Sequence, residues 1–205
     1  MSEQTDTYYT VAGSSMATYR DKASRFIGLV EPVLTEEAVK TILKSLKKTY
    51  YDANHHCYAY RLGWDYSLYR MNDDGEPSGT AGRPIFGQIQ SFNLTNVLVV
   101  VVRYFGGTKL GASGLINAYR TVTRDALQQA GQSEKTVHEH HRLDFAYDRM
   151  NEVMKIIKEK NLQILSTDFM EKCSLVYGIR RQLAAAMVEE WQKKPGISVQ
   201  ILKTE

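Results

Sequence analysis

The sequence predicts an α+β protein made of two domains, residues 1–133 and 134–205. The 205-residue chain is 43% hydrophobic and 24% charged, an ordinary globular composition that allows two small domains with buried cores. The run Val97–Val102 is apolar at every position, as expected for a central strand covered on both faces. After the first domain, the periodicity alternates in the order β-α-β-β-α-β.

The clearest element of the first domain is a helix that begins after Thr35. The Thr35 hydroxyl is suited to cap this helix, and Glu36 and Glu37 complement the positive end of its dipole. Apolar residues then follow helical spacing and predict one buried stripe, formed by Val39, Ile42, Leu43, Leu46 and Tyr50.

The other elements of the first domain are predicted from alternation and turn residues, with frayed ends in the first ten residues. They are strands at Tyr8–Ala12, Ser24–Val30, His56–Leu62 and Asp65–Met71, a loop at Asn72–Pro84, and helices at Ile85–Ser91 and Ser113–Ala130. Gly63-Trp64 makes the turn between the two aromatic strands. Pro84 takes the first position of its helix, and Gly131 caps the last one.

The second domain is predicted to be a ferredoxin-like sandwich, because its element order is the split β-α-β pattern. The predicted elements are strand Thr136–Tyr147, helix Met150–Lys160, strands Gln163–Met170 and Lys172–Gly178, helix Gln182–Lys193 and strand Gly196–Leu202. The boundary between the domains is placed near Gly131–Lys135.

Charge and hydropathy exclude several classes of function. The net charge of +3 is spread over both domains, so any nucleic acid must bind a local patch. The longest apolar run is far shorter than the ~20 residues of a membrane span, and the polar N-terminus has no export signal. We therefore expect a cytoplasmic protein with no membrane partner, in which Cys57 and Cys173 are free thiols.

Two loops of the first domain carry the residues suited to binding. The glycine loop contains Gly106, Gly107, Gly111 and Gly114 between a buried strand and a helix start, where backbone N–H groups can approach an anion. Nearby cations are Arg83, Arg103, Lys109 and Arg120. The spacing matches neither a Walker A loop nor a dinucleotide fingerprint, and tight turns alone would also explain the glycines.

The second loop is acidic, with Asp73, Asp74 and Glu76. These side chains suit a divalent cation or acid–base chemistry, but their spacing fails the calcium-loop pattern and also describes a solvated turn. His55 and Cys57 share one face of a strand, which is one ligand short of a catalytic zinc site. We therefore predict no metal site and no cofactor.

Tyrosines alternate along the two aromatic strands and offer two interpretations. They are Tyr58, Tyr60, Tyr66 and Tyr69, and they lie beside Arg61 and Arg70. Such a row predicts either cross-strand packing over a core or a platform on which nucleobases stack.

Four segments of the first domain have long and unusual sequences. They are Asp-Asp-Gly-Glu-Pro-Ser-Gly-Thr-Ala-Gly-Arg-Pro at Asp73–Pro84, Arg-Tyr-Phe-Gly-Gly-Thr-Lys-Leu-Gly at Arg103–Gly111, Ser24–Gly28 and Ala53–Arg61. Together they resemble the Impact/YigZ family. The chain departs from the family pattern at Ser113, where glycine is typical, and at His56, where asparagine is more frequent. The resemblance implies an N-terminal domain like domain 2 of ribosomal protein S5 and a C-terminal ferredoxin-like domain. It also implies translational regulators among eukaryotic relatives, which act by binding a protein partner of a stress kinase, and nucleic-acid or ribosome binding among bacterial ones.

The leading functional hypothesis is a non-enzymatic, translation-associated protein that binds RNA, the ribosome or a translation factor. In this hypothesis the phosphates are bound by Arg83, Arg103, Lys109 and Arg120. Close approach of the ligand to the backbone is allowed by Gly106, Gly107 and Gly111. The site is supported, or a basic partner is bound, by Asp73, Asp74, Glu76 and His55. The alternative is an enzyme or sensor that binds a phosphorylated small molecule at the glycine loop, with His55, Cys57 or Asp74 reactive; a protein-docking module is a third interpretation. A monomer is the working expectation.

Overall fold

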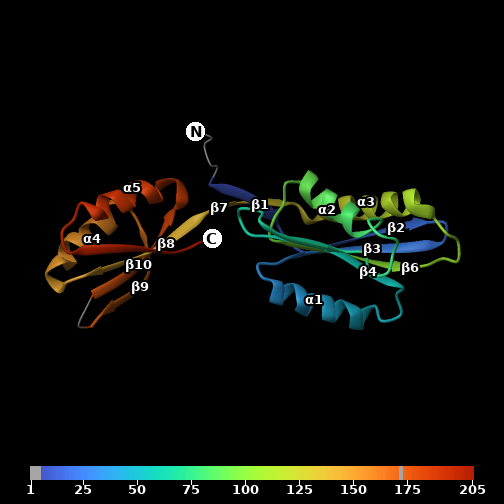
Figure 1. Ribbon diagram of the computed structural model, residues 1–205, viewed down its shortest axis with the longest axis horizontal. Coiled ribbons are helices and arrows are strands. Elements are labelled where there is room, and N and C mark those ends of the chain that lie inside the picture. Colours follow the sequence, from blue (N-terminus) through green and yellow to red (C-terminus); the bar gives the residue numbers. More distant parts are fainter. Residues whose placement is uncertain (1–5, 171–172) are drawn as a thin grey trace. The chain divides into compact units, whose positions relative to one another are not determined.

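The computed structural model describes residues 6–170 and 173–205, and the chain divides into two units (Figure 1). Residues 8–135 form the first unit, and Asp6 and Thr7 together with the described part of residues 136–205 form the second. The α+β class with a ferredoxin-like second domain is confirmed. Among the described residues, no helix is long and apolar enough to span a bilayer.

The first unit is built on a five-stranded antiparallel sheet in the order β2-β3-β6-β4-β5. Its strands are β2 (Ser15–Asp21), β3 (Ser24–Pro32), β4 (His55–Leu62), β5 (Leu68–Asn72) and β6 (Val97–Tyr104). Helix α1 (Glu36–Thr49) covers one face, while α2 (Gly82–Ser91) and α3 (Gly111–Ala130) cover the other (Figure 1). A separate two-stranded ribbon pairs β1 (Thr7–Val11) with β7 (Gln132–Thr136).

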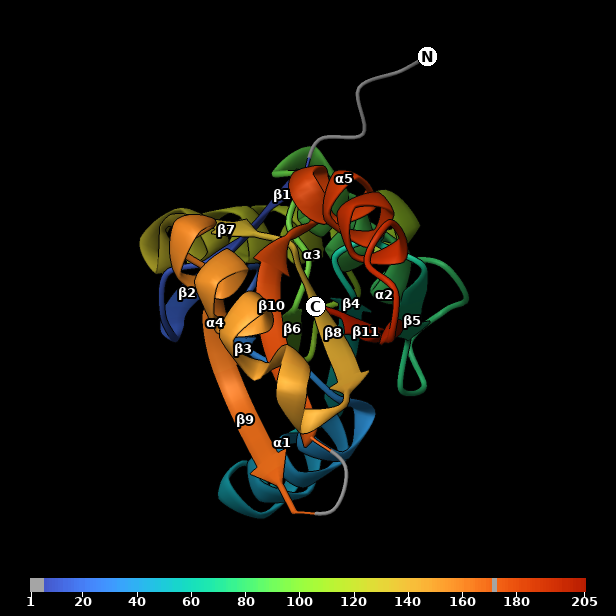
Figure 2. The ribbon, with the colours of Figure 1, turned by 90° about the vertical axis from the view of Figure 1, so that its left-hand side faces the viewer.

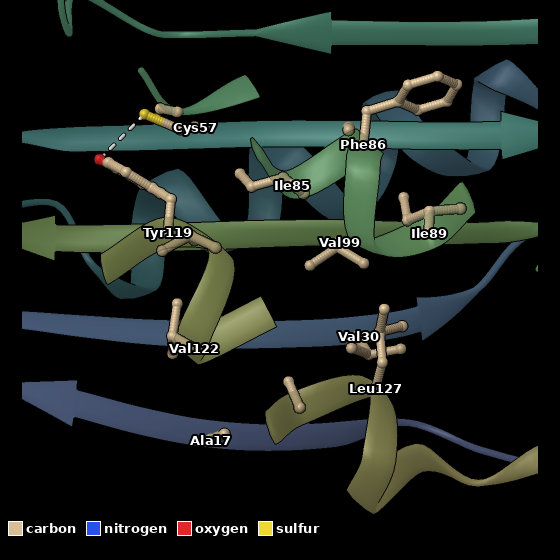
Figure 3. Packing of buried hydrophobic residues seen from close by; sticks show 14 of the residues in the cluster. Ala17, Val30, Cys57, Ile85, Phe86, Ile89, Val99, Tyr119, Val122 and Leu127 are labelled. Carbon is tan, nitrogen blue, oxygen red and sulfur yellow. Dashed lines mark hydrogen bonds between the residues drawn. The ribbon is translucent and has the colours of Figure 1, made fainter. Parts of the chain in front are cut away.

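The central strand behaves as its apolar sequence predicts. In β6, Val97, Val99 and Val101 join the core under α2 and α3, whereas Leu98, Val100 and Val102 join the core under α1. The α2–α3 side is shown in Figure 3, where Tyr119 of α3 reaches Cys57 of β4. Burial on both faces explains why every position of this strand is apolar.

The predicted start and stripe of α1 are also confirmed. Thr35 Oγ1 accepts a hydrogen bond from the Ala38 N–H at 3.2 Å, and Glu36 and Glu37 lie in the first turn. The apolar stripe packs on the sheet and contributes Val39, Ile42, Leu43, Leu46 and Tyr50 to the core.

The second unit is a four-stranded antiparallel sheet in the order β11-β8-β10-β9 (Figure 2), the strand order of a ferredoxin-like fold. Its elements are β8 (His138–Phe145), a 3₁₀ turn (Tyr147–Arg149), α4 (Met150–Glu159), β9 (Gln163–Phe169), β10 (Cys173–Arg180), α5 (Arg181–Gln192) and β11 (Ile197–Thr204). Within its core, the Tyr177 hydroxyl lies 3.0 Å from His141 Nδ1 and accepts from Trp191 Nε1 at 2.9 Å. These buried polar groups are therefore paired, as burial demands.

Several predicted boundaries were wrong. Strand β2 was missed because it is an edge strand with many polar residues, and the predicted strand Thr136–Tyr147 is divided between β7 and β8. Helix α2 begins at Gly82, so Pro84 occupies its third position, and β5 begins only at Leu68. Helix α3 begins at Gly111, two residues before Ser113.

The start of the chain also differs from expectation, because Asp6 is held inside the second unit. Its carboxylate accepts from Arg180 Nη2 at 2.9 Å, and its carbonyl accepts from the Val137 N–H at 2.7 Å. The expected fraying of residues 1–5 lies outside the described residues. The hydrogen bond from Arg180 lowers the pKa of Asp6 below its ordinary value.

We predict that Asp6→Asn destabilises the protein at pH 7 by about 1 kcal/mol, because Arg180 is half exposed and the ion pair is partly screened. Since the pKa of Asp6 is lower in the folded state, its stabilisation is complete above the unfolded pKa of about 3.9 and is lost as pH falls through the folded value. Urea denaturation of both proteins at neutral and acidic pH measures the difference. Exposed Asp148→Asn is the control, and an equal effect of both changes would contradict the assignment.

Candidate functional site

The acidic loop between β5 and α2 is folded around its own backbone. Asp73 Oδ1 accepts from the Ala81 and Gly82 N–H groups at 3.0 and 2.8 Å, and Oδ2 accepts from the Gly79 N–H at 2.9 Å. The carboxylate of Asp73 therefore caps α2, as negative charge at a helix N-terminus favours. These hydrogen bonds also explain why α2 begins at Gly82, earlier than the position of Pro84 predicted.

Asp74 joins the same loop to β4. Its Oδ2 accepts from the His56 N–H at 2.7 Å, and its carbonyl accepts from His55 Nδ1 at 2.8 Å. Lys47 of α1 lies 3.5 Å from the other carboxylate oxygen. The roles of Asp73 and Asp74 are thus structural, and among the described residues no three metal-ligating side chains converge.

Glu76 and Arg103 form a buried ion pair at the base of the loop. Arg103 Nη1 donates to Glu76 Oε1 at 2.6 Å, and the two residues are only 5% and 8% exposed. The Tyr119 hydroxyl donates to the same oxygen at 2.8 Å, while His55 Nε2 lies 4.0 Å away. Because an unpaired buried charge is costly, each member of this pair requires the other.

This pairing corrects the predicted role of Arg103 as an outward phosphate ligand. The Arg103 guanidinium lies between the rings of Phe26 and Phe105, with centroid distances of 5.4 and 5.5 Å. It contacts both rings and is neutralised by Glu76, so its charge is largely hidden from solvent.

Cys57 and Tyr119 lie beside the ion pair but are not reactive groups. Cys57 is fully buried, and its Sγ lies 3.0 Å from the Asp73 carbonyl and 3.3 Å from the Tyr119 hydroxyl. Burial raises the pKa of Cys57 to about 12 and also raises the pKa of Tyr119. A thiol that stays protonated at neutral pH does not act as a nucleophile.

The glycine loop turns tightly against β3 before α3 begins. A Cβ on Gly106 would lie 2.1 Å from the Ala23 carbonyl carbon, so only glycine fits this contact. Gly107 and Gly111 have φ values of +85° and +75°, which also favour glycine. The glycines at these three positions are therefore explained by the turn itself.

Two separate hollows border the acidic loop and the glycine loop. The smaller, of about 340 Å³, lies at the start of α3 and is lined by Glu76, Pro77, Arg103, Phe105, Lys109, Leu110, Gly111, Ala112 and Leu115. The larger, of about 630 Å³, lies between β5, α2 and α3 and is lined by Tyr69, Met71, Gly79, Arg83, Pro84, Phe86, Gly87, Gln88, Gln90, Ile116 and Arg120. Lys109 is thus separated from Arg83 and Arg120.

The three outer cations are available to a ligand. Arg83, Lys109 and Arg120 are exposed, and in the described part of the chain none of them has an ion-pair or hydrogen-bond partner. The lining of the larger hollow contains two arginines and no carboxylate. The resulting surface favours an anion at the face formed by α2 and α3.

Most of the first unit matches the model of a known protein domain. The model of the Impact N-terminal domain matches residues 22–127. The chain belongs to the Impact family. The matched region includes both loops, the buried ion pair and the two hollows.

Relatives of this Impact-family chain include bacterial proteins of similar organisation. The IMPACT family member YigZ of Escherichia coli is 33% identical over 84% of this chain and 84% of its own length. The IMPACT family member YvyE of Bacillus subtilis is 39% identical over 62% of this chain, and the matched part spans 59% of that protein. A crystal structure described as that of a hypothetical protein covers 98% of both chains with a TM-score of 0.73 and 28% identity.

The tyrosines of this Impact-family chain divide between the two faces of the sheet. Tyr58 and Tyr60 pack on the α1 side, and the Tyr66 ring lies 3.9 Å below the Arg61 guanidinium carbon. Only Tyr69 reaches the larger hollow, so the four tyrosines form no continuous platform. Phe86 and Gly87 also line this hollow, which the sequence did not predict; the alternating Tyr69 and Met71 of the edge strand β5 lie beside them.

We predict that Glu76→Gln destabilises the first unit by about 3–5 kcal/mol, because the amide leaves Arg103 charged and uncompensated in a buried place. Hydrogen exchange of β6 peptides, with β10 peptides as an internal control, reports this loss. The double change Glu76→Gln with Arg103→Met removes the stranded charge and is expected to recover part of the protection. Unchanged exchange in Glu76→Gln would show that the ion pair is not a structural requirement.

Proposed function

We propose that this protein is a non-enzymatic, translation-associated binding protein of the cytoplasm that contacts RNA, free or within the ribosome, through its first unit. The single observation that carries the proposal is the exposure of Arg83, Lys109 and Arg120 without carboxylate partners in the described structure. Phosphate contacts from such side chains supply most of the affinity of nucleic-acid binding. The translational role implied by the family resemblance supports RNA or a ribosomal surface as the source of the phosphates.

The side chains that could act in catalysis are buried and paired inside the fold, which supports binding over catalysis. Glu76 is held by Arg103 and Tyr119, and the Cys57 thiol has a pKa of about 12. The larger hollow offers arginines and glutamines, which bind anions and amide groups but do not exchange protons near neutral pH. The same surface suits phosphate recognition without chemical change.

The alternative partner is a phosphorylated small molecule at the start of α3. Lys109 lines the smaller hollow there, and the residue that precedes the helix, Leu110, has no side-chain group that caps it. Such a ligand would depend on Lys109 and would not require the arginines of the larger hollow. That difference separates the two functions experimentally.

We predict that Arg83→Ala with Arg120→Ala weakens RNA binding and reduces its dependence on salt. Loss of two contacts to a single strand should reduce the slope of log K against log salt by about 1.4, since each contact contributes about 0.7. Fluorescence anisotropy with labelled RNA, supported by co-sedimentation with ribosomes, measures both effects.

The matched control is Arg124→Ala, because Arg124 lies on the same helix, α3, but is already paired with Asp125 at 2.8 Å. We expect it to bind RNA almost as the unchanged protein does. Binding that is independent of salt, or that is unaffected by the double change, would contradict the RNA function. Binding of a phosphorylated small molecule that is lost in Lys109→Ala and kept in the double arginine change would favour the small-molecule alternative.

A further inference from the structure

The larger hollow contains an aromatic ring that is supported on one side and open on the other. The rings of Tyr69 and Phe86 stack with centroids 4.8 Å apart and an interplanar angle of 23°. Phe86 projects from α2 across β4 (Figure 3) and is only 7% exposed, whereas Tyr69 is 53% exposed. The Tyr69 ring is therefore held in place while much of its surface meets solvent.

Gly87 lines this hollow without adding side-chain atoms to it. It lies within α2, and a Cβ added there would meet no heavy atom within 4 Å. Its φ is not in the left-handed region, so neither packing nor backbone conformation requires glycine. Glycine weakens a helix relative to alanine, and its presence here has no explanation in the stability of the fold.

The charged and amide side chains around the hollow suit the recognition of phosphates and bases. Arg83 on α2 and Arg120 on α3 are the cations of the lining, and Gln88 and Gln90 present amide donors and acceptors. Arginines bind phosphates, glutamine amides pair with base edges, and an exposed aromatic ring stacks on a base. A duplex keeps its bases stacked internally, so only an unpaired base presents a face to Tyr69.

We propose that the hollow between β5, α2 and α3 binds an unpaired nucleotide of an RNA strand, with the base stacked on Tyr69 over the space left by Gly87 and the flanking phosphates held by Arg83 and Arg120. The inference rests on the proposed function and specifies the form of RNA that is recognised. An acidic peptide would satisfy the two arginines but would leave the open ring and the glutamine amides unused.

The test is fluorescence anisotropy of the full chain with a single-stranded oligouridylate of about ten nucleotides, a length within the usual range of single-strand sites. Tyr69→Ala is expected to weaken binding about tenfold, while Tyr69→Phe keeps the ring and the affinity. Tyr51→Ala, at another exposed tyrosine, is the matched control and should change nothing.

Gly87→Ala distinguishes an effect on the site from an effect on the stability of the fold. The change should raise the melting temperature, because alanine favours the helix, and should weaken oligouridylate binding several-fold, because the methyl group enters the hollow. Gly87→Leu should weaken binding further. Loss of affinity in a more stable protein excludes unfolding as its cause.

Several results would overturn the inference. The first is unchanged oligouridylate affinity in both Tyr69→Ala and Gly87→Ala. The second is a hairpin duplex that binds as tightly as oligouridylate, or a polyglutamate peptide that binds more tightly. Oligodeoxythymidylate that binds as tightly as oligouridylate would overturn the assignment to RNA. If affinity falls in the double arginine variant but not in these two, the proposed RNA function stands and the nucleotide site fails. If no RNA probe binds at all, the proposed function itself fails.

Discussion

The arrangement of the two loops beside α2 and α3 depends on the buried ion pair between Arg103 and Glu76. Arg103 lies near the end of the central strand β6, and Glu76 lies in the loop that leads into α2. Removing either charge would leave the other largely buried and without its partner, so the strand end and the loop are fixed to each other. Tyr119 adds α3 to the same carboxylate and thereby ties a third element to this point.

This internal neutralisation determines which charges remain outside. Asp73 is used to cap α2, Asp74 holds β4, and Glu76 pairs with Arg103, so the three acidic residues of the loop are directed to structural contacts. The cations next to them are exposed without such partners in the described structure. The segment from Asp73 to Arg120 contains nearly as many acidic as basic residues, yet the surface it presents is positive.

The parts of this account that sequence predicts are those governed by local physics. The burial of Val97–Val102 on both faces, the Thr35 cap and the β-α-β-β-α-β order follow from hydropathy, capping and periodicity, and the structure confirms them. The early start of α2 depends on a side chain nine residues before Gly82, and the burial of Arg103 depends on a partner 27 residues away. Such long-range pairings are decided by tertiary structure, which is also why Gly87 and Phe86 gave no functional signal on their own. The roles of Arg83, Lys109 and Arg120 in binding remain predictions.

The most direct test of the central claim is the position of RNA on the full chain. Photocrosslinking with RNA that carries 4-thiouridine, followed by mass spectrometry of the crosslinked peptides, maps that position in the unchanged protein. The account predicts that crosslinks concentrate on peptides from β5 and α2, with Tyr69 among the modified residues. Crosslinks confined to α1 or to the second unit would contradict it.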